Sequence, residues 1–544
     1  MRPVVLIILD GWGIAPNGPG NAIGLSNLPF YQRLLRDYPN GLLEASGEAV
    51  GLPKGESGNT ETGHLNLGAG YIVYQDLPRI NLAVADGSFF TRQAFLLAID
   101  HVRKYQSNIH LLGLIGSGGV HSNIEHLLAL LQLLKEQAYQ RVFLHLITDG
   151  RDSPPKSALL YIEQIQTFLD SLGFGEIATV MGRYYAMDRD HRWDRTEKAY
   201  KVLTEGIGDK GTSTQEIIKH SYEKGITDEF ILPSAVTKDG KLTPRISAND
   251  SVIFFNYRID RPRQLTNAFV LENFKRDANL RDFDPYSVKY FKKHEVIECL
   301  LQEPFERGPM IPHLYFVTMT EYSKSVHVSN VAFPPQIVLN PLSECIAKQG
   351  LYQLKLAESE KERFVTYYFN GQRENPFTGE DITIVPSPKV PTYDLKPEMS
   401  AAQITEKLLE NLKKDRYHLI IMNFANPDMV GHTGAITATV KACEYLDGCL
   451  SKIVPAILDK GGTVFITGDH GNAEELINPK SKDVDTEHST YPVPFITINN
   501  DFRGKNISLM KGVLADVAPT ILDLMKIKKP QSMTGRNLLE NILS

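Results

Sequence analysis

Apolar runs alternate with amphipathic segments along most of the chain, and this alternation predicts an α/β protein with mainly parallel sheets. Nearly continuous apolar runs such as VVLIIL and LIIMNF are typical of strands buried on both faces. One helix is well marked in HSNIEHLLALLQLLKEQA, where leucines recur at helical spacing. Ser122 followed by Glu125 predicts a capping box at the start of this helix.

The residues that follow the predicted strands form two chemical classes. Ligand-binding groups in open α/β sheets lie just beyond the carboxyl ends of the strands. Near the start of the chain and in its last third, these residues are carboxylates and imidazoles: Asp10 after VVLIIL, Asp428 and His432 after LIIMNF, Asp469 and His470 after TVFIT, and His488 further on. We call these six residues the metal set, because carboxylates and imidazoles are metal ligands.

The middle of the chain gives mostly guanidinium groups at the corresponding positions. Arginine binds carboxylates and phosphates through two parallel hydrogen bonds. The residues are His121 in GSGGVHS, Arg151 and Asp152 in DGRDSPP, Arg183 and Arg189 in GRYYAMDRDHRW, and Arg258 and Arg261 in YRIDRPRQ. We call the five arginines the arginine set. Together they indicate a site for an anionic substrate, although any one arginine alone could form a surface salt bridge.

The separation of the two classes along the sequence predicts the domain organisation. A chain of 544 residues is too long for one ordinary domain. We predict a discontinuous metal domain at 1–75 and 312–544. A second α/β domain, at 76–311, is inserted into it and carries the arginine set.

The metal set contains enough ligands for two divalent ions. Mixed oxygen and nitrogen ligands suit Mn²⁺ or Zn²⁺ better than Ca²⁺. Three carboxylates and two divalent ions leave a net positive charge, which would attract a phosphate group. Taken singly, each aspartate could instead be a helix cap and each histidine a structural residue.

A glycine-rich stretch, GESGNTETGHLNLGAG, places Thr60 where the chain is expected to enter a helix. Backbone N–H groups at a helix start favour an anion. A threonine hydroxyl becomes a nucleophile when a metal ion or a base takes its proton. The local sequence alone favours the alternative, in which Thr60 is only an N-cap residue.

Composition narrows the class of protein. The formal net charge of −6 is small for this length and argues against a general nucleic-acid surface. No run approaches the roughly 18 apolar residues of a membrane helix, and Asp10 stops the first apolar run, as in a buried strand rather than a signal peptide. No CxxC pair occurs among the four cysteines, Cys299, Cys345, Cys443 and Cys449. We therefore expect free thiols in a cytoplasmic monomer without nucleic-acid or membrane partners.

Several ordered motifs resemble one family over nearly the whole chain. The segments are LDGWG, GNTETGHLNLGAG, GGVHS, DGRDSPP, GRYYAMDRD, AESEK, PSPKVPTYDLKPEMS, NPDMVGH and GDHGNAE. In this order they resemble the cofactor-independent phosphoglycerate mutases of the alkaline phosphatase superfamily. The resemblance implies an α/β fold with an alkaline-phosphatase-like metal domain and an inserted substrate domain.

The resemblance also implies a reaction and a role for each site residue. The reaction is the interconversion of 3-phosphoglycerate and 2-phosphoglycerate in glycolysis and gluconeogenesis, without 2,3-bisphosphoglycerate. It would use two divalent ions, Mn²⁺ first and Zn²⁺, Co²⁺ or Mg²⁺ as alternatives, and a phosphothreonine at Thr60. The implied ligands of one ion are Asp428, His432 and His488, and those of the other are Asp10, Asp469, His470 and Thr60.

The resemblance assigns the remaining residues to the substrate. Lys361 in AESEK would contact the phosphoryl group, and Asp152 would act as acid or base. The family usually has serine at the position of Thr60, whereas the similar phosphopentomutases have threonine. The implied glycerate ligands are His121, Arg151, Asp152, Arg183, Arg189, Arg258 and Arg261.

Three other classes of protein remain as alternatives. A metal-dependent phosphomonoesterase or a phosphopentomutase-like phosphotransferase would share the metal set but would not need the arginine set. A binding protein without catalytic activity would keep the arginines and could lose metal ligands. A structural protein predicts no ordered pattern of ligands at all.

Overall fold

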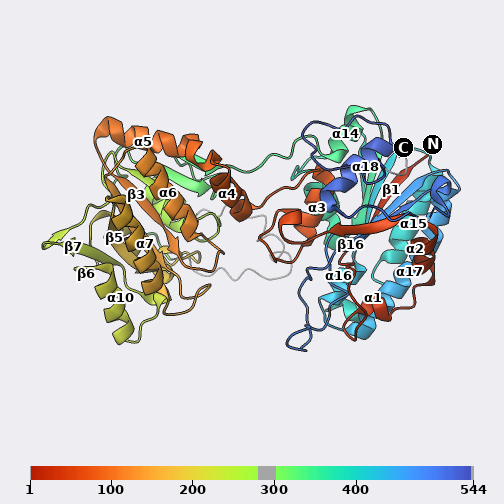
Figure 1. Cartoon of the computed structure of the whole chain (residues 1–544), viewed down its shortest axis with the longest axis horizontal. Helices are drawn as coiled ribbons and strands as arrows, with labels where there is room; N and C mark the ends of the chain where they lie inside the picture. Colours follow the sequence, from red (N-terminus) through yellow and green to blue (C-terminus); the bar gives the residue numbers. More distant parts are fainter. Residues whose placement is uncertain (1, 280–301, 506, 541–544) are drawn as a thin grey trace. The chain divides into compact units, whose positions relative to one another are not determined.

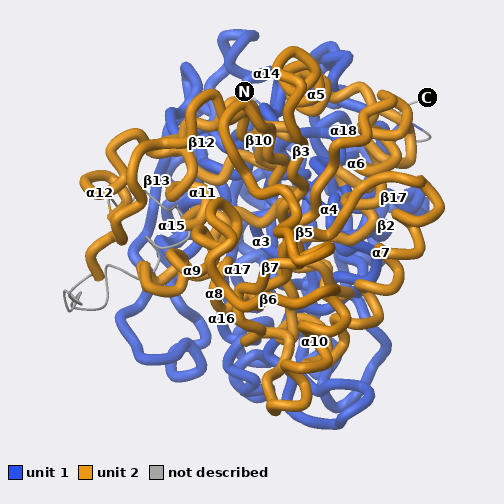
Figure 2. Tube along the Cα trace, turned by 90° about the vertical axis from the view of Figure 1, so that its left-hand side faces the viewer, with its two compact units in different colours: residues 1–78, 336–544 blue, residues 79–335 orange. Residues whose placement is uncertain are grey.

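The computed structural model describes residues 2–279, 302–505 and 507–540. The chain forms two compact units, which Figure 2 shows in different colours. Unit 1 contains Met1–Pro78 and Gln336–Ser544, and unit 2 contains Arg79–Pro335. Each unit has its own sheet, and the described residues form eight strands in unit 1 and nine in unit 2.

Unit 1 is built around a central strand, β1 (Val4–Leu9), which pairs in parallel with β14 (Leu419–Phe424) and β15 (Thr463–Thr467). The strand order is β13-β12-β14-β1-β15-β16-β2-β17. The other strands are β2 (Asn40–Glu44), β12 (Gln353–Glu358), β13 (Glu380–Val385), β16 (Val493–Ile498) and β17 (Gly512–Val513). Only β16 runs antiparallel to its neighbours, β15 and β2.

Helices cover both faces of the unit 1 sheet, which explains why β1 is apolar throughout. Val5, Ile7 and Leu9 pack against α2 (Pro29–Asp37), α15 (Ala401–Lys413) and α17 (Ile436–Leu458). The alternate residues of β1 pack against α14 (Leu342–Lys348) and α18 (Val517–Leu524) on the opposite face. These two groups of helices flank the sheet in Figure 1. The remaining helices of unit 1 are α1 (Ala22–Leu25), α3 (Thr60–Ala69) and α16 (Asn426–Gly431), and α4 (Asp76–Ala85) crosses into unit 2.

Unit 2 has a second, mainly parallel sheet in the order β11-β10-β9-β3-β4-β5-β7-β6, with β8 paired to β7. Its strands are β3 (Ile109–Ile115), β4 (Val142–Thr148), β5 (Glu176–Gly182), β6 (Asp209–Gly211), β7 (Ser234–Lys238), β8 (Lys241–Leu242), β9 (Ser251–Phe254), β10 (Tyr315–Thr320) and β11 (Asn330–Phe333). Its helices are α5 (Gln93–Tyr105), α6 (Ile124–Glu136), α7 (Ala158–Leu172), α8 (Arg183–Ala186), α9 (Trp193–Thr204), α10 (Thr214–Glu223), α11 (Pro262–Val270) and α12 (Phe274–Asp277). Helices α9 and α11 contribute to the core on one face, and α5, α6 and α7 lie over the sheet in Figure 1.

The predicted boundary at 312 differs from the structure. Strands β10 and β11 follow this position, yet they belong to the sheet of unit 2. Unit 2 therefore continues to Pro335. No residue of the metal set or of the arginine set directly follows β10 or β11, so the sequence offers no reason to assign these two strands to one unit or the other.

The predicted capping box of α6 is wrong. The helix begins at Ile124, and the side chain of Asn123 accepts the backbone N–H of Glu125. The hydroxyl of Ser122 instead donates to the carbonyl of Leu114 at the end of β3. Asn123 can take the capping position because asparagine is as good an N-cap residue as serine.

The described cysteines agree with the expectation of free thiols. Cys345, Cys443 and Cys449 are buried and unpaired, and Cys299 lies outside the described residues. Within the part of the chain that the structure describes, no helix has both the length and the apolar character needed to cross a membrane.

Candidate metal centre and anion site

Three buried carboxylates meet at one edge of the unit 1 sheet. Asp10 follows β1, Asp428 lies in α16 after β14, and Asp469 follows β15. These three strands are adjacent and parallel, so their carboxyl ends lie at the same edge. The side chains of Asp10 and Asp469 are fully buried, and that of Asp428 is 2% exposed. Three carboxylates in so little water require nearby cations.

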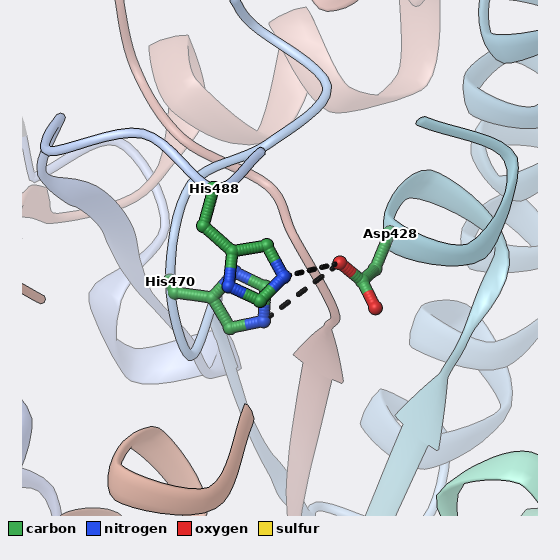
Figure 3. Close-up of side chains that lie close together, drawn as sticks. All are labelled: Asp428, His470 and His488. Atoms are coloured by element: carbon green, nitrogen blue, oxygen red, sulfur yellow. Dashed lines mark ion pairs between the residues drawn. The ribbon is translucent and has the colours of Figure 1, made fainter. Parts of the chain in front are cut away.

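The histidines of the metal set complete two overlapping groups of ligand atoms. One group contains Asp428, His470 and His488, and the other contains Asp10, Asp469 and His470. Within each group the ligand atoms lie within 4.8 Å of one another, and His470 is shared. Figure 3 shows both imidazoles of the first group directed at the Asp428 carboxylate, with Nε2 distances of 3.9 Å for His470 and 3.3 Å for His488.

His432 lies beside the first group. It follows the last residue of α16, and its Nε2 is 3.2 Å from Asp428 Oδ1 and 3.1 Å from His488 Nε2. All six residues of the metal set are therefore brought together, as the sequence predicts. The implied ligand sets differ from the compact groups in one respect: His470 lies close to both groups, whereas His432 belongs to neither.

The ring orientations of the three histidines fit metal binding. In each ring, Nδ1 faces a backbone carbonyl, at 2.8 Å for His432 and Thr486, 2.9 Å for His488 and Gly58, and 3.2 Å for His470 and Gly471. A proton on Nδ1 donates to that carbonyl and leaves the Nε2 lone pair facing the carboxylates. Metal-bound histidines are commonly oriented in this way. The residues present therefore fit a centre for divalent cations.

Thr60 is the first residue of α3, but it is not the cap of this helix. The side chain of Asn59 accepts the backbone N–H of Thr62, so Asn59 is the N-cap residue. The Thr60 hydroxyl is free for other contacts and lies 2.9 Å from His470 Nε2 and 3.4 Å from Asp10 Oδ1. The interpretation of Thr60 as an N-cap residue is thus wrong.

Lys361 contacts one carboxylate from each of the two ligand groups. It ends a short turn (Ser359–Lys361) after β12 and is 2% exposed. Its Nζ lies 2.6 Å from Asp10 Oδ1, 2.6 Å from Asp428 Oδ2 and 3.2 Å from Thr60 Oγ1. The ammonium group therefore occupies a position that attracts cations.

The pKa shifts reflect the same excess of negative charge. Burial acts to lower the pKa of Lys361, but the carboxylates of Asp10 and Asp428 raise this pKa above its usual value. Burial opposes the charge of Asp428, yet the Lys361 ammonium holds the pKa of that carboxyl well below its usual range. The carboxylates likewise overcome burial and raise the pKa of His470 to about 10. The shifts of Lys361 and His470 favour their cationic forms, and the shift of Asp428 favours its negatively charged carboxylate.

Several residues of the centre were not found from the sequence. Asn472 Nδ2 donates to Asp428 Oδ1 at 3.1 Å, and His64 Nδ1 lies 3.1 Å from Asp469 Oδ2. His64 is also four residues after Thr60 on the same helix, where i and i+4 side chains share a face. That spacing was the available signal for His64, whereas nothing in the local sequence distinguishes Asn472.

Unit 2 gathers its predicted residues at the corresponding edge of its own sheet. Arg183, at the start of α8 after β5, is 2% exposed and forms ion pairs with Asp149 and Asp152. Both aspartates follow β4. Burial acts to lower the pKa of Arg183, but its hydrogen bond to Asp152 raises it, so the guanidinium remains charged.

A third carboxylate, Asp260, contacts the remaining predicted residues of this site. It pairs with Arg189 at 2.8 Å and with Arg258 at 3.1 Å, and His121 Nδ1 lies 3.7 Å away. Burial and the Arg183 charge lower the pKa of His121 to about 4, so this imidazole is neutral near pH 7. The sequence prediction included Asp152 but missed Asp149 and Asp260, whose contacts with Arg183, Arg189 and Arg258 join separate segments of the chain.

A cavity of about 270 Å³ in unit 2 is lined by four members of the arginine set. Burial and the neighbouring arginines lower the pKa of Arg261, which indicates crowding of positive charge. An anion in the cavity would relieve this repulsion. The cavity lining does not include His121, Asp152 or Arg258. Asp152 pairs with the lining residue Arg183 and lies 3.7 Å from His121, and Arg258 pairs with Asp260, which also pairs with the lining residue Arg189. The lining arginines are Arg151, Arg183, Arg189, Arg195 and Arg261, of which Arg195 was not predicted.

Comparison with known proteins gives one consistent result. The family model described as the BPG-independent PGAM N-terminus matches residues 80–324. A 2,3-bisphosphoglycerate-independent phosphoglycerate mutase of Chloroflexus aggregans is 49% identical over 542 residues, covering 99% of this chain and 98% of that protein. The corresponding protein of Moorella thermoacetica is 48% identical, with coverage of 99% and 98%. The solved structure of Leishmania mexicana phosphoglycerate mutase at low cobalt concentration is 27% identical, with a TM-score of 0.54 and coverage of 98% of this chain and 97% of that one.

Carboxylates and imidazoles lie at an edge of the unit 1 sheet, and arginines lie at an edge of the unit 2 sheet. This α/β fold and these two groups of residues define an isomerase that moves a phosphoryl group within a small anionic substrate. The chain belongs to the family of 2,3-bisphosphoglycerate-independent phosphoglycerate mutases. It interconverts 3-phosphoglycerate and 2-phosphoglycerate, and the predicted fold class and activity are confirmed.

Proposed function

We propose that the isomerisation passes through a phosphothreonine at Thr60. The observation that supports this most directly is the position of the Thr60 hydroxyl, 2.9 Å from His470 Nε2 and 3.2 Å from Lys361 Nζ at the start of a helix. Because Asn59 caps the helix, the hydroxyl has no competing role in capping. A phosphoryl group stored on the protein also removes the need for a bisphosphorylated donor.

We propose that two divalent ions complete this centre. Asp428, His432 and His488 would hold one ion, and Asp10, Asp469, His470 and Thr60 would hold the other. When bound, the ions lower the pKa of the threonine hydroxyl and offset charge on the transferring oxygens. Mixed carboxylate and imidazole donors favour Mn²⁺, with Zn²⁺, Co²⁺ or Mg²⁺ as alternatives. The cobalt named for the Leishmania mexicana structure supports a transition metal.

The substrate is held by two kinds of residue. Lys361 donates hydrogen bonds to the phosphoryl oxygens, as its buried ammonium suits a centre of developing negative charge. The glycerate carboxylate and hydroxyls bind in unit 2 to His121, Arg151, Asp152, Arg183, Arg189, Arg258 and Arg261. The neutral imidazole of His121 accepts or donates a single hydrogen bond without adding charge.

The reaction then consists of two matched transfers. Thr60 Oγ1, having given up its proton to solvent, forms a bond to phosphorus, while the bond from phosphorus to O3 of the substrate breaks and O3 receives the proton of the O2 hydroxyl through Asp152. Asp152 carries the proton between the glycerate oxygens, and O2 then takes the phosphoryl group from Thr60. The ion pair with Arg183 lowers the pKa of Asp152 against the effect of burial, so Asp152 starts as a carboxylate that can accept the proton.

The test is to trap the phosphoenzyme. Protein with Mn²⁺ and 3-phosphoglycerate is quenched in acid, and peptide mass spectrometry locates the phosphoryl group. We expect it on Thr60, and on the serine of Thr60→Ser. Thr60→Ala should still bind Mn²⁺ and 3-phosphoglycerate but should lose mutase activity by roughly 10⁴-fold or more, as for other nucleophile deletions. Mutase activity in Thr60→Ala close to that of the wild type would refute the covalent route.

The state of the protein in the cell is a further proposal. The modest net charge and the buried free thiols support a cytoplasmic protein that acts as a monomer. Size-exclusion chromatography with light scattering at micromolar concentration tests the oligomeric state, and a dimer would contradict the proposal.

A further inference from the structure

Beneath the proposed metal centre, two fully buried polar side chains connect carboxylates that the sequence places far apart. Asn423, in β14, donates from Nδ2 to Asp10 Oδ2 at 2.7 Å. The same Nδ2 lies 3.1 Å from His64 Nε2, and His64 Nδ1 lies 3.1 Å from Asp469 Oδ2. The four side chains form one continuous chain of polar contacts from Asp10 to Asp469.

The orientation of the Asn423 amide follows from its neighbour. Its carbonyl oxygen cannot face Asp10, because two acceptors would then repel each other. The amide nitrogen therefore points to Asp10 and to His64, and its two hydrogens serve these two contacts. Reversal of the amide would break both contacts.

The orientation of Asn423 also determines the tautomer of His64. Since Asn423 donates to Nε2, this nitrogen must be the acceptor, and the proton of a neutral imidazole is on Nδ1. The Nδ1–H group then donates to the backbone carbonyl of Thr60 at 3.0 Å, and Asp469 Oδ2 lies 3.1 Å from the same nitrogen. His64 thus links the Asp469 carboxylate to the first turn of the helix that carries Thr60.

These contacts divide the oxygens of Asp10 between two tasks. Asn423 occupies Oδ2, whereas Oδ1 faces Thr60, Lys361 and His470. A carboxylate fixed through one oxygen presents the other in a single direction. Side chains that hold ligands in this way commonly change metal affinity by about 10–100-fold when they are removed.

We propose that His64 and Asn423 are positioning residues that orient Asp469 and Asp10 and thereby set the affinity of the protein for the ion held by these two carboxylates. This inference rests on the proposed metal centre. It assigns to His64 and Asn423 no contact with substrate or with the ion itself. It predicts that the loss of either residue weakens the binding of one of the two ions. The affinity for the other ion, held through Asp428, His432 and His488, should stay nearly unchanged.

The experiment measures Mn²⁺ binding to the full chain without substrate, by calorimetry and by electron paramagnetic resonance. The variants are Asn423→Ala and His64→Leu, each of which breaks the chain of contacts at one residue. We expect one of two sites to weaken by about 10–100-fold in each variant, with loss of the spectral coupling between paired ions. His64→Asn places an amide donor near the position of Nδ1 and should restore part of the affinity.

His145→Asn in unit 2 is the matched control. His145 is also fully buried, and its two ring nitrogens contact His110 Nδ1 and Thr179 Oγ1, both at 2.9 Å. Replacement should lower the melting temperature and leave both Mn²⁺ affinities unchanged. This control separates a positioning role from a general loss of stability.

The outcomes distinguish this inference from the proposal on which it depends. If the wild type binds two ions and His64→Leu and Asn423→Ala bind both with unchanged affinity, the positioning role is wrong. An equal loss of affinity for both ions would also overturn the positioning role, because the effect would then not be local to Asp10 and Asp469. If the wild type binds no Mn²⁺, the metal centre itself fails, whatever the variants do.

Discussion

Lys361 is a buried, charged side chain whose burial depends on the carboxylates around it. A buried ammonium costs several kcal/mol unless opposite charges compensate. Asp10 and Asp428, each 2.6 Å from Nζ, provide that compensation. The same carboxylates are proposed ligands of different ions. We therefore propose that Lys361 neutralises the carboxylates in the metal-free protein and contacts the phosphoryl group in the loaded one.

A substitution at Lys361 should distinguish these two roles. Lys361→Met leaves two buried carboxylates without their shared partner, so unit 1 should lose about 3–5 kcal/mol of stability in chelator. Saturating Mn²⁺ should restore most of this loss, because the ions then neutralise the carboxylates. Mutase activity should still fall by about 10²–10³-fold, as on loss of one group that stabilises transition-state charge. Thermal unfolding with and without chelator, together with kcat, measures both effects.

Lys355 offers a matched control for this substitution. It is also fully buried, but its Nζ donates to the hydroxyl of Ser343 at 2.8 Å, and burial lowers its pKa to about 8. Lys355→Met should change stability equally with and without chelator and should keep the activity. An equal loss in both states for Lys361→Met would contradict the dual role of Lys361.

At the level of single residues, the sequence predicts those proposed ligands that follow strands. Asp10 and Asp469 come directly after apolar runs, and parallel strands bring such positions together. His64 and Asn423 escape this rule, because one lies inside a helix and the other inside a strand. Their role depends on contacts between distant segments, which no local pattern contains.

Among the elements, helix α3 owes its glycine-rich sequence to close packing. A Cβ atom on Gly63 would lie 2.5 Å from the carbonyl oxygen of Asp469, and one on Gly68 would lie 1.9 Å from that of Phe369. Both distances are shorter than any normal contact. The helix can therefore approach the loop that carries Asp469 and His470 only where it lacks side chains.

Gly63→Ala should move α3 away from this loop. A shift of about 1 Å at the reacting groups can reduce catalysis by about 100-fold, and we expect a loss of kcat of this order. Gly448→Ala, within α17, is the control, because nothing lies within 4 Å of its added methyl group. That variant should gain up to about 1 kcal/mol of stability with unchanged kcat. Unchanged kcat in Gly63→Ala would show that the close approach is not required.

The elements were more predictable than their ends. The apolar run of β1 indicated a strand buried on both faces, and its alternate residues do pack into two cores. The start of α6 was assigned to the wrong capping residue, because Ser122 and Asn123 are both good caps and only the contact of Ser122 with Leu114 decides between them. Helix α3 was expected as a turn into a helix, but its cap was placed one residue too late.

On the scale of the whole molecule, unit 2 is one continuous segment with its own hydrophobic core. We predict that residues 79–335, expressed alone, unfold in a single cooperative transition. The isolated segment should bind phosphoglycerate weakly through the arginine cavity and should not bind Mn²⁺, since the metal set lies in unit 1. Calorimetric titration with each ligand measures this, with Arg183→Met as the control that removes a lining arginine.

Two results would contradict this prediction. Failure of the segment to fold would show that unit 2 depends on unit 1 for stability. Tight Mn²⁺ binding by the segment would show that the two classes of residue do not separate by unit. The sequence predicted the separation from residue chemistry alone, but it could not place the second boundary, because no residue of the metal set or of the arginine set directly follows β10 or β11.

The central position of β1 has a consequence for synthesis on the ribosome. β1 emerges before every other described strand, yet its partners β14 and β15 begin only at Leu419 and Thr463. All strands of unit 2 are made in the interval, so unit 2 can fold while VVLIIL still has no sheet to join. An unpaired apolar strand of this kind is prone to aggregate. We therefore expect the nascent chain to engage a chaperone at its N-terminal segment until almost the whole polypeptide has been translated.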